Sequence, residues 1–380
     1  MPRNVPMRWC KRCCEPDTRP TCVFDDEGIC RPCGYAETYS QIDWVERRKT
    51  LDQIIAWAKK NNPSGYDCVI GVSGGKDSTR QALFAKEVGL NPLLVSYAYP
   101  PEQLVERGAQ NLANLVTLGF DAITVAPAPQ TSKALMRYCF VNYGNLFNAS
   151  ELALYASTPK IAIAYRIPLI LLGENPALSW GTAAGGSLDH RGNLIRHTNT
   201  LQGGDYRRFV PQGMEAKDVY WYRYPTDHEL ERGNLQIVYI GYFIADFNDH
   251  SNSRIAIENG LRVREGDEAD PENTGSLYNF ISLDDDFVLV NQMLKYLKYG
   301  YGMASQEVSG AIRAGLISRE DGISYVRKYD GRIADHYIKR AADYMGMSVA
   351  EFWRIAEKFR NMDIWEKDQV GEWKLKVELH

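Results

Sequence analysis

Short apolar runs alternate with amphipathic stretches along residues 66–172. The runs have the length of buried strands, and the stretches between them place apolar residues at helical spacing. The pattern predicts strands over 66–72, 93–97, 122–125 and 168–172, and helices over 77–88, 102–118, 131–140 and 151–166. Such alternation is typical of an α/β fold in which a parallel sheet carries helices on both faces.

The chain on either side of this alternating part has a different pattern. A helix is predicted over 42–60, and it ends where residues 61–65, N-N-P-S-G, break the periodicity. A further buried strand is predicted over 236–243, and from Asp284 onward the pattern is helical. We therefore expect three parts, over residues 1–39, 40–260 and 261–380, of which the last is mainly helical.

The first predicted strand leads into residues 71–78, G-V-S-G-G-K-D-S, which open the next helix. A glycine turn at a helix N-terminus presents backbone N–H groups and the helix dipole to an anion such as phosphate. Gly74 and Gly75 let the backbone approach that anion closely. Lys76 adds a positive charge, and Asp77 is a candidate Mg²⁺ ligand.

This loop is not a Walker A sequence, because Ile70 stands at the first glycine position and Asp77 follows the lysine. It resembles the PP-loop, S-G-G-x-D-S, of the N-type ATP pyrophosphatases; an ordinary glycine-rich turn is the alternative. In that superfamily the loop holds the departing pyrophosphate, and ATP is cleaved between its α and β phosphates. The resemblance implies an adenine nucleotide alpha hydrolase-like domain that uses ATP and Mg²⁺, with Lys76 and Asp77 as catalytic residues. The predicted ATP-binding residues are Gly71, Val72, Ser73, Gly74, Gly75, Lys76, Asp77, Ser78, Ser96 and Tyr97.

In parallel sheets, ligands bind beyond the carboxyl ends of the strands. That rule brings together residues 73–78, 96–99, 126–130 and 173–180. Glu174 directly follows a buried strand and is a candidate catalytic residue that binds Mg²⁺, binds substrate or orients ammonia. Asn175 is a candidate to bind substrate or phosphate. The alternative for this pair is an Asx turn before Pro176.

Two further polar stretches are less specific. Residues 179–204 are glycine-rich and hold His190, Arg191 and His197, to which the sequence assigns no contacts. Residues 246–252, D-F-N-D-H-S-N, follow the predicted strand over 236–243. They form either a second polar site or a solvated turn.

Six of the eight cysteines lie within the first 33 residues. Two C-x-x-C pairs, Cys10 with Cys13 and Cys30 with Cys33, have the spacing of a four-cysteine zinc site. We predict an N-terminal zinc ribbon with a structural role, because four thiolates leave no open position at the metal. An iron–sulfur cluster and a disulfide pair are the alternatives, and a reducing compartment argues against the disulfide.

The composition is that of an ordinary soluble globular chain, with 44% apolar and 24% charged residues. A formal net charge of −4 provides no basic field, so we expect no nucleic acid partner. The longest aliphatic run, 167–172, is too short to cross a membrane, and residues 1–9 lack the apolar core of a secretion signal. We therefore expect a cytoplasmic protein with no membrane partner.

Several of these motifs occur together in one family. They are P-D-T-R-P at 16–20, D-E-G-I before Cys30, the loop at 71–78, G-E-N-P at 173–176 and K-Y-G-Y-G at 298–302. In this combination the sequence resembles the N-acetyl sugar amidotransferases of bacterial lipopolysaccharide O-antigen and flagellin-sugar biosynthesis. The resemblance implies an enzyme that adenylates an acetamido group of a nucleotide-linked sugar and replaces its oxygen with ammonia to give an acetamidino group. It also implies that a separate glutaminase and a cyclase-like subunit supply the ammonia.

A PP-loop enzyme that thiolates a tRNA base is the alternative interpretation. Such an enzyme shares the ribbon and the loop, but it needs a reactive cysteine in the catalytic part, where only Cys68 and Cys139 are available. Cys68 lies in a predicted buried strand, which is typical of a core residue. A third interpretation is a non-enzymatic scaffold that retains an ATP-binding domain, and the intact Lys76 and Asp77 argue against it.

Overall fold

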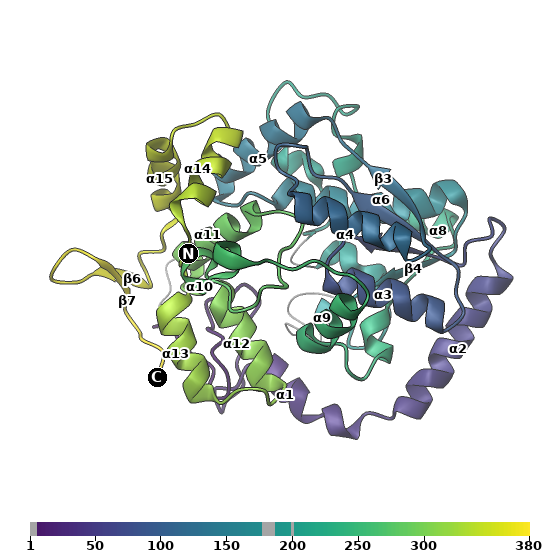
Figure 1. Ribbon diagram of the computed structural model, residues 1–380, viewed down its shortest axis with the longest axis horizontal. Coiled ribbons are helices and arrows are strands. Elements are labelled where there is room, and N and C mark those ends of the chain that lie inside the picture. The colour runs from purple at the N-terminus through teal and green to yellow at the C-terminus, as the bar shows by residue number, and fades with distance from the viewer. Residues whose placement is uncertain (1–5, 177–186, 199–200) are drawn as a thin grey trace.

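The computed structural model describes residues 6–176, 187–198 and 201–380. Its centre is a five-stranded sheet in the order β3-β2-β1-β4-β5, and every neighbouring pair in it is parallel (Figure 1). The strands are β1 (Cys68–Val72), β2 (Pro92–Tyr97), β3 (Asp121–Val125), β4 (Leu169–Leu172) and β5 (Gln236–Tyr239). The parallel sheet predicted from the alternating pattern is confirmed.

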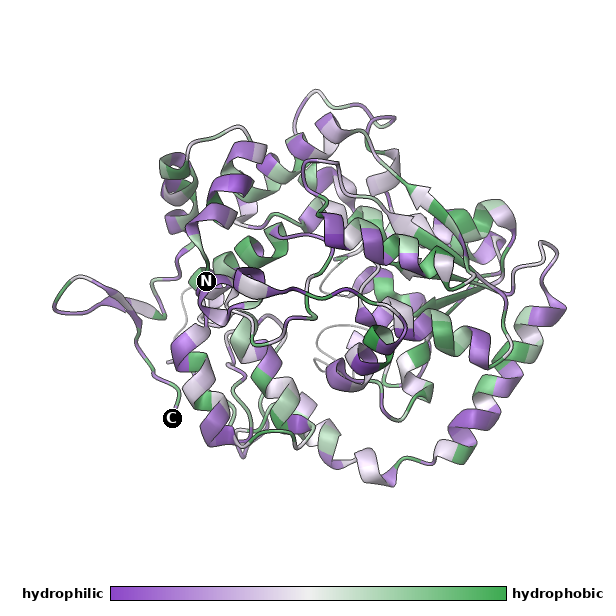
Figure 2. Ribbon diagram, viewed as in Figure 1, coloured by the Kyte–Doolittle hydropathy of each residue, from purple (hydrophilic) through white to green (hydrophobic). Residues whose placement is uncertain are grey.

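Helices cover both faces of this sheet, as predicted. One face carries α2 (Trp44–Lys60), α3 (Lys76–Glu87) and α4 (Glu106–Thr117), with α9 (Asp249–Glu258) packed against α3; the other carries α5 (Pro129–Tyr143) and α6 (Asn148–Tyr165). Successive strand side chains point to opposite faces of the sheet. Ile70 packs in the core on the α3 face, and Val69 packs in the core on the α6 face. Strands buried on both faces read as continuous apolar runs. Figure 2 shows this apolar centre, and within the described residues no helix has both the length and the apolar content needed to cross a membrane.

The strand predicted over 236–243 is wrong in its second half. β5 ends at Tyr239, which lies opposite Leu172 at the end of β4, so the neighbouring strand offers no further partner. The next residues form the 3₁₀ helix η6 (Ile240–Phe243), in which Gly241 N–H donates to Gly173 O at 3.1 Å. A side chain at Gly241 would lie 3.0 Å from that same carbonyl. The apolar run continues past the strand because this turn is itself partly buried.

The region after residue 260 is mainly helical, as predicted. Its longer helices are α11 (Phe287–Tyr299), α12 (Met303–Arg313), α13 (Arg319–Tyr329), α14 (Asp335–Tyr344) and α15 (Val349–Ala356). All of these except α13 enclose, together with α5, a second core in which the rings of Phe140 and Phe352 stack at 4.6 Å. An antiparallel hairpin of β6 (Trp365–Lys367) and β7 (Trp373–Leu375) projects from this region (Figure 1). Among the described residues, the other short α-helices are α1 (Arg31–Glu37), α8 (Asp227–Arg232) and α10 (Pro271–Thr274).

The N-terminal segment packs on these C-terminal helices. Trp9 Nε1 donates to Val377 O at 3.1 Å. Arg319, the first residue of α13, donates to the carbonyl oxygens of Cys13 and Cys10 at 3.3 and 3.2 Å. The first and last parts of the sequence are therefore in direct contact, although the whole α/β part separates them along the chain.

Candidate active site and metal centre

The loop at 71–78 lies where the strand order reverses. β1 pairs with β2 on one side and with β4 on the other, so the chain leaves β1 at the topological switch point, where ligands bind in such sheets. The helix α3 begins at Lys76, directly after the glycine turn. Gly74 has a φ of +81°, and a side chain there would lie 3.0 Å from Leu112 N. Both conditions favour glycine, because its backbone adopts a positive φ and packs closely against α4.

Hydrogen bonds within the loop fix its shape. Gly75 N–H donates to Ser73 Oγ at 3.4 Å, and the hydroxyl of Ser78 donates to Gly75 O at 3.1 Å. The hydroxyl of Thr79 donates to the same carbonyl at 2.9 Å. Gly75 is the N-cap of α3 and supplies no side chain to cap the helix. The N–H groups of the first turn are therefore left for an anion.

Two residues of α9 hold the charged pair of the loop. Lys76 Nζ lies 2.6 Å from Asp77 Oδ2 and 2.8 Å from Asp249 Oδ1. Asn252 Nδ2 donates to Asp77 Oδ1 at 2.8 Å. Burial alone lowers the pKa of Lys76, but the two carboxylates outweigh it and raise the pKa above its usual range, so the lysine stays charged. The polar cluster at 246–252 is therefore part of the loop site, because α3 and α9 pack side by side.

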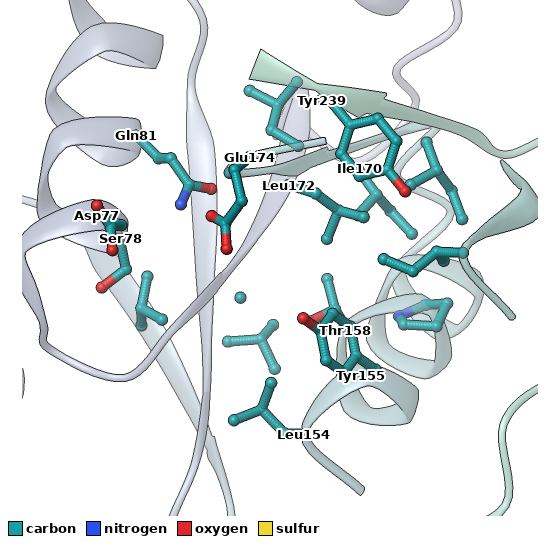
Figure 3. Close-up of a pocket in the computed structure, with 18 of the residues that line it drawn as sticks. Asp77, Ser78, Gln81, Leu154, Tyr155, Thr158, Ile170, Leu172, Glu174 and Tyr239 are labelled. Atoms are coloured by element: carbon teal, nitrogen blue, oxygen red, sulfur yellow. The ribbon is translucent and has the colours of Figure 1, made fainter. Parts of the chain in front are cut away.

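Glu174 and Asn175 follow β4 but have different surroundings. Figure 3 shows the Glu174 carboxylate directed into a cavity, across from Asp77. The enclosing protein raises the pKa of Glu174 by desolvation, and the charge of Asp77 raises it further. Asn175 is buried, and its Nδ2 donates to the carbonyl oxygens of Ser187 and Asp189, both at 2.7 Å. Glu174 is thus accessible to a ligand, whereas the Asn175 amide anchors a neighbouring segment, and ligand binding by Asn175 stays a prediction.

The cavity beside the loop has a volume of about 200 Å³. Its polar side is formed by Ser73, Asp77, Ser78, Gln81 and Glu174. The remaining walls come mainly from α6, β4 and β5 and carry aliphatic and tyrosine side chains. In Figure 3 the polar side chains of α3 lie on one side of the cavity, and Tyr155 and Tyr239 lie on the other. The cavity therefore joins a charged end at the loop to a largely apolar interior.

Of the two residues predicted to bind ATP at the end of β2, Tyr97 lines this cavity, and its hydroxyl lies 3.4 Å from that of Tyr222. Ser96 is buried, and its hydroxyl has no hydrogen-bond partner among the described residues. Residues 126–130 were expected at the same edge, but they are absent from the cavity lining that the structure describes. Residues 177–180 lie outside the described residues.

The structure adds site residues that the sequence did not single out. Gln81 lies one helical turn after Asp77 on α3, so the spacing of four positions was a signal for it. Tyr239 is the last residue of β5, and the rule for strand ends identifies it once β5 is known to stop there. Tyr155 and Thr158 lie one turn apart on α6 and line the opposite wall. Nothing in the sequence of α6 distinguishes them from residues of the core.

The histidine and arginine side chains of the glycine-rich stretch lie elsewhere. His190 packs against the rings of Tyr242 and Phe243, at centroid distances of 5.9 and 5.4 Å. Arg191 is exposed and pairs with Asp189 at 2.6 Å. Neither is part of the cavity lining that the structure describes. The sequence assigned no contacts to them, and the structure gives them local partners.

The four predicted zinc ligands come together at the N-terminus. Their sulfur atoms lie within 4.8 Å of one another, and they belong to Cys10, Cys13, Cys30 and Cys33, all buried. Two of the Sγ–Sγ distances are 3.6 and 4.0 Å. A tetrahedral site with Zn–S bonds of about 2.3 Å separates its sulfurs by about 3.8 Å, so the cluster fits zinc. Cys14 and Cys22 are not part of the cluster, as the spacing predicted.

Donors around the cluster favour the thiolate form of its sulfurs. Arg12 N and Cys30 N donate to Cys10 Sγ at 3.4 and 3.3 Å. Arg313 of α12 lies 3.9 Å from Cys13 Sγ through its guanidinium group. Hydrogen bonds and a cation of this kind offset the negative charge that four thiolates place on a zinc site. The C-terminal helices thus complete the surroundings of the N-terminal cluster.

Comparisons with known proteins identify the C-terminal region. Residues 274–379 match the family described as LPS biosynthesis protein WbpG-like, C-terminal domain. Because of this similarity, we refer to residues 274–379 as the WbpG-like domain. No curated protein matches the chain. Among solved structures, a predicted subunit of tRNA methyltransferase from Methanocaldococcus jannaschii aligns at 15% identity and a TM-score of 0.30, over 60% of this chain and 87% of its own. Similarity at that level says nothing about function.

The WbpG-like domain contacts both the N-terminal cysteine cluster and helix α9. It includes α12 and α13, which pack on the cysteine cluster, and it begins just before Tyr278. The hydroxyl of Tyr278 lies 3.0 Å from Nε2 of His250, which is the neighbour of Asp249 on α9. The domain therefore extends from the cysteine cluster to α9, the helix whose Asp249 contacts Lys76.

Proposed function

We propose that this chain is an ATP-dependent, AMP-forming amidotransferase that converts an acetamido group of a nucleotide-linked sugar to an acetamidino group. The observation that carries the proposal is the placement of Lys76, Asp77 and Glu174 around a PP-loop-like turn at the switch point of a parallel sheet. The WbpG-like domain supports a role in lipopolysaccharide biosynthesis, and O-antigen or flagellin sugars are the expected products.

The proposed chemistry has two steps. The amide oxygen of the acetamido group attacks the α-phosphate of ATP, and pyrophosphate leaves. Ammonia then adds to the activated carbon, AMP leaves with the oxygen, and loss of a proton gives the amidine. The protein supplies charge stabilisation and positioning, and no side-chain nucleophile is needed.

The loop residues suit the first step. The N–H groups at the start of α3 and the ammonium group of Lys76 are placed to neutralise the departing pyrophosphate. Asp77 offers carboxylate oxygens, the ligand type that Mg²⁺ prefers, and bound Mg²⁺ would supply further neutralisation of phosphate charge. Asp249 and Asn252 keep the lysine and the aspartate in place before ATP arrives.

Glu174 suits the second step. Ammonia must lose a proton as the amidine forms, and a carboxylate with a raised pKa is a better proton acceptor than an ordinary glutamate. The Glu174 side chain lies between the loop and the cavity, where the activated carbon would be held. In our proposal it orients ammonia and accepts this proton.

The proposal includes partners. A separate glutaminase with a cyclase-like subunit would release ammonia for this chain. The acetamido substrate is uncharged at its reacting end, so it needs no basic surface, in keeping with a net charge of −4. We expect the reaction to take place in the cytoplasm, where ATP and nucleotide sugars are made.

Thiolation of tRNA has less support. Cys68 and Cys139 are fully buried, and burial raises the pKa of both thiols, that of Cys139 to about 12. A thiol in such surroundings is protonated at neutral pH and unreactive. These are the two cysteines of the catalytic part, so this part lacks the nucleophile that the thiolation reaction requires.

One experiment tests the proposed reaction. The purified chain is incubated with ATP, Mg²⁺, ammonium chloride and a panel of nucleotide-linked N-acetyl sugars. We expect AMP, pyrophosphate and a sugar product one mass unit lighter than its precursor, because an oxygen atom is exchanged for an NH group. The matched control omits ammonium. Release of ADP and phosphate in place of AMP and pyrophosphate would contradict the proposal.

A further inference from the structure

Within the part of the chain that the structure describes, the hydroxyl of Tyr239 is buried without a partner. The residue is 1% exposed, and among the described residues nothing forms a hydrogen bond with its oxygen. Burying an unpaired hydroxyl costs free energy, so nearly all buried polar groups are satisfied. Tyr239 lines the cavity beside the loop. A bound ligand that supplies the missing hydrogen bond would explain both the burial and the position.

The wall around Tyr239 offers hydroxyl groups. Tyr155 and Thr158 of α6 and the buried Tyr224 line the same cavity. The strand backbones behind them are paired within the sheet, as between Leu171 and Val238. Hydroxyls both donate and accept, which suits a ligand whose own hydroxyls rotate, such as a sugar. A purine base presents a fixed pattern of donors and acceptors, which is usually matched by free backbone groups.

The apolar part of the cavity suits an acyl group and one face of a ring. Leu154, Leu172 and Ile237 supply aliphatic surface close to the polar end at Glu174. The volume of about 200 Å³ is below the roughly 300–1,000 Å³ of sites that enclose a whole drug-sized ligand. The cavity therefore holds one substituted ring, and the rest of the ligand stays outside. Figure 3 shows Tyr239 across the cavity from Asp77 and Ser78, so a ring bound in the cavity would lie between them.

We propose that this cavity receives the N-acylated sugar ring of the acceptor, and that the hydroxyl of Tyr239 forms a hydrogen bond with a polar group of that ring. The inference rests on the proposed function and names a specificity-determining residue for it. A site built to bond a substrate hydroxyl or amide rejects analogues that lack it, because its own buried group is then left unpaired. Tyr239 thereby selects acceptors whose sugar ring carries a polar group that can form a hydrogen bond with the tyrosine hydroxyl.

The test compares Tyr239→Phe, which removes one oxygen atom, with the wild-type protein and with Tyr337→Phe. Tyr337 is the matched control, because its hydroxyl is also buried and unpartnered among the described residues but lies outside the cavity. Binding is measured by calorimetry on the full chain with Mg²⁺ and α,β-methylene-ATP, which resists cleavage at the α–β position. The probes are UDP-N-acetylglucosamine, UDP-N-acetylgalactosamine, UDP alone and the ATP analogue itself.

We expect Tyr239→Phe to weaken binding of at least one UDP-N-acetyl sugar by about 3- to 10-fold, the effect of one neutral hydrogen bond. Binding of UDP and of the ATP analogue should stay within about twofold of wild type, as should every affinity of Tyr337→Phe. The melting temperature of ligand-free Tyr239→Phe should equal or exceed that of the wild type, because the removed hydroxyl had no partner.

Three results would overturn the proposal. Weaker binding of the ATP analogue with unchanged sugar binding would assign the cavity to adenosine. A lower melting temperature without ligand would show that the hydroxyl has a structural partner. Failure of the wild-type protein to bind either UDP-N-acetyl sugar would show that the cavity is not a binding site for the acceptor.

The outcome can be separated from that of the proposed function. Binding is measured at equilibrium without ammonium, whereas the proposed function is judged by AMP, pyrophosphate and amidine. If sugar binding depends on Tyr239 but no amidine forms, the assignment of the cavity is supported and the proposed reaction is refuted. Amidine formation with unaltered sugar binding in Tyr239→Phe would keep the reaction and refute the assignment of the cavity.

Discussion

Asn252 of α9 donates a hydrogen bond of 2.8 Å to Asp77 of α3, across 175 positions of the sequence. The same turn of α9 places Asp249 2.8 Å from Lys76. The two charged residues of the loop are therefore oriented by a helix outside the loop motif. The PP-loop-like turn depends on α9 for its working geometry.

The first prediction concerns these α9 residues. We expect Asn252→Ala and Asp249→Asn each to lower amidine formation by about 10- to 100-fold, the usual effect of losing a group that orients a ligand-binding residue. Arg254→Ala is the matched control, because Arg254 lies on α9 with an exposed side chain. Steady-state rates and melting temperatures of the three variants decide the question. Equal losses in all three would show that α9 acts only through stability.

The second prediction concerns the loop itself. We expect Lys76→Ala and Asp77→Ala to lower the rate of pyrophosphate release by at least about 100-fold, since each removes charge stabilisation from the reacting phosphates. Lys86→Ala, at the far end of α3, is the control and should keep its rate. A pyrophosphate-release assay together with circular dichroism separates catalysis from folding. Full activity in Lys76→Ala would refute the assigned role.

Local patterns were sufficient to predict the sheet and the loop. The run over 66–72 and the glycine turn after it contain their own signals, because burial on both faces favours apolar residues and a tight turn favours glycine. The cysteine spacing was equally informative, and the structure places all four sulfurs together. The helical C-terminal region likewise followed from periodicity alone.

The pairing of distant elements was not predictable from such patterns. The cluster at 246–252 was expected to be a separate site or a turn, because no pattern in its sequence indicates that α9 packs on α3. The end of β5 was misplaced because a buried 3₁₀ turn and a buried strand are equally apolar. Tyr239 was missed for the same reason. Its importance depends on a cavity formed by several elements that are far apart in the sequence.

The third prediction concerns the metal centre. We expect one zinc ion per chain, and Cys30→Ser should lose it and lower the melting temperature, because four buried sulfurs without metal cannot hold this segment together. Cys22→Ser is the control, since Cys22 lies outside the cluster. Elemental analysis and thermal unfolding measure both effects. Iron with sulfide, or no metal in the wild-type protein, would refute the prediction.

The fourth prediction concerns Glu307, whose carboxylate accepts hydrogen bonds from Ser276 Oγ at 2.6 Å and Leu277 N at 2.7 Å. Burial outweighs these hydrogen bonds and raises the pKa of Glu307 to about 8, from an ordinary 4.5. Between these values the native state binds more protons than the unfolded state, so its stability falls as pH rises through this window.

Glu307→Gln tests this directly, because glutamine keeps the shape and does not titrate. Urea unfolding at pH 5 and pH 8 should show a larger loss of stability for the wild type than for the variant. An identical change in both proteins would show that Glu307 is already ionised at pH 5.

The last prediction is that the isolated chain uses free ammonium but not glutamine. Hydrolysis of glutamine normally requires a cysteine nucleophile activated by a neighbouring base. Four of the eight cysteines form the metal cluster, and Cys68 and Cys139 are fully buried. The remaining two, Cys14 and Cys22, have pKa values raised to about 12, chiefly by burial, so their thiols are protonated at neutral pH.

None of these cysteines is therefore poised to attack glutamine, and we expect the ammonia to come from a partner. Amidine formation is compared with ammonium chloride and with glutamine, using the purified chain alone and then with a glutaminase and its cyclase-like subunit. We expect turnover with ammonium in every case, and with glutamine only when the partners are present. Raising the pH should increase the ammonium-dependent rate, because the uncharged amine is the nucleophile. Glutamine-dependent turnover by the isolated chain would reveal a catalytic thiol among the eight cysteines.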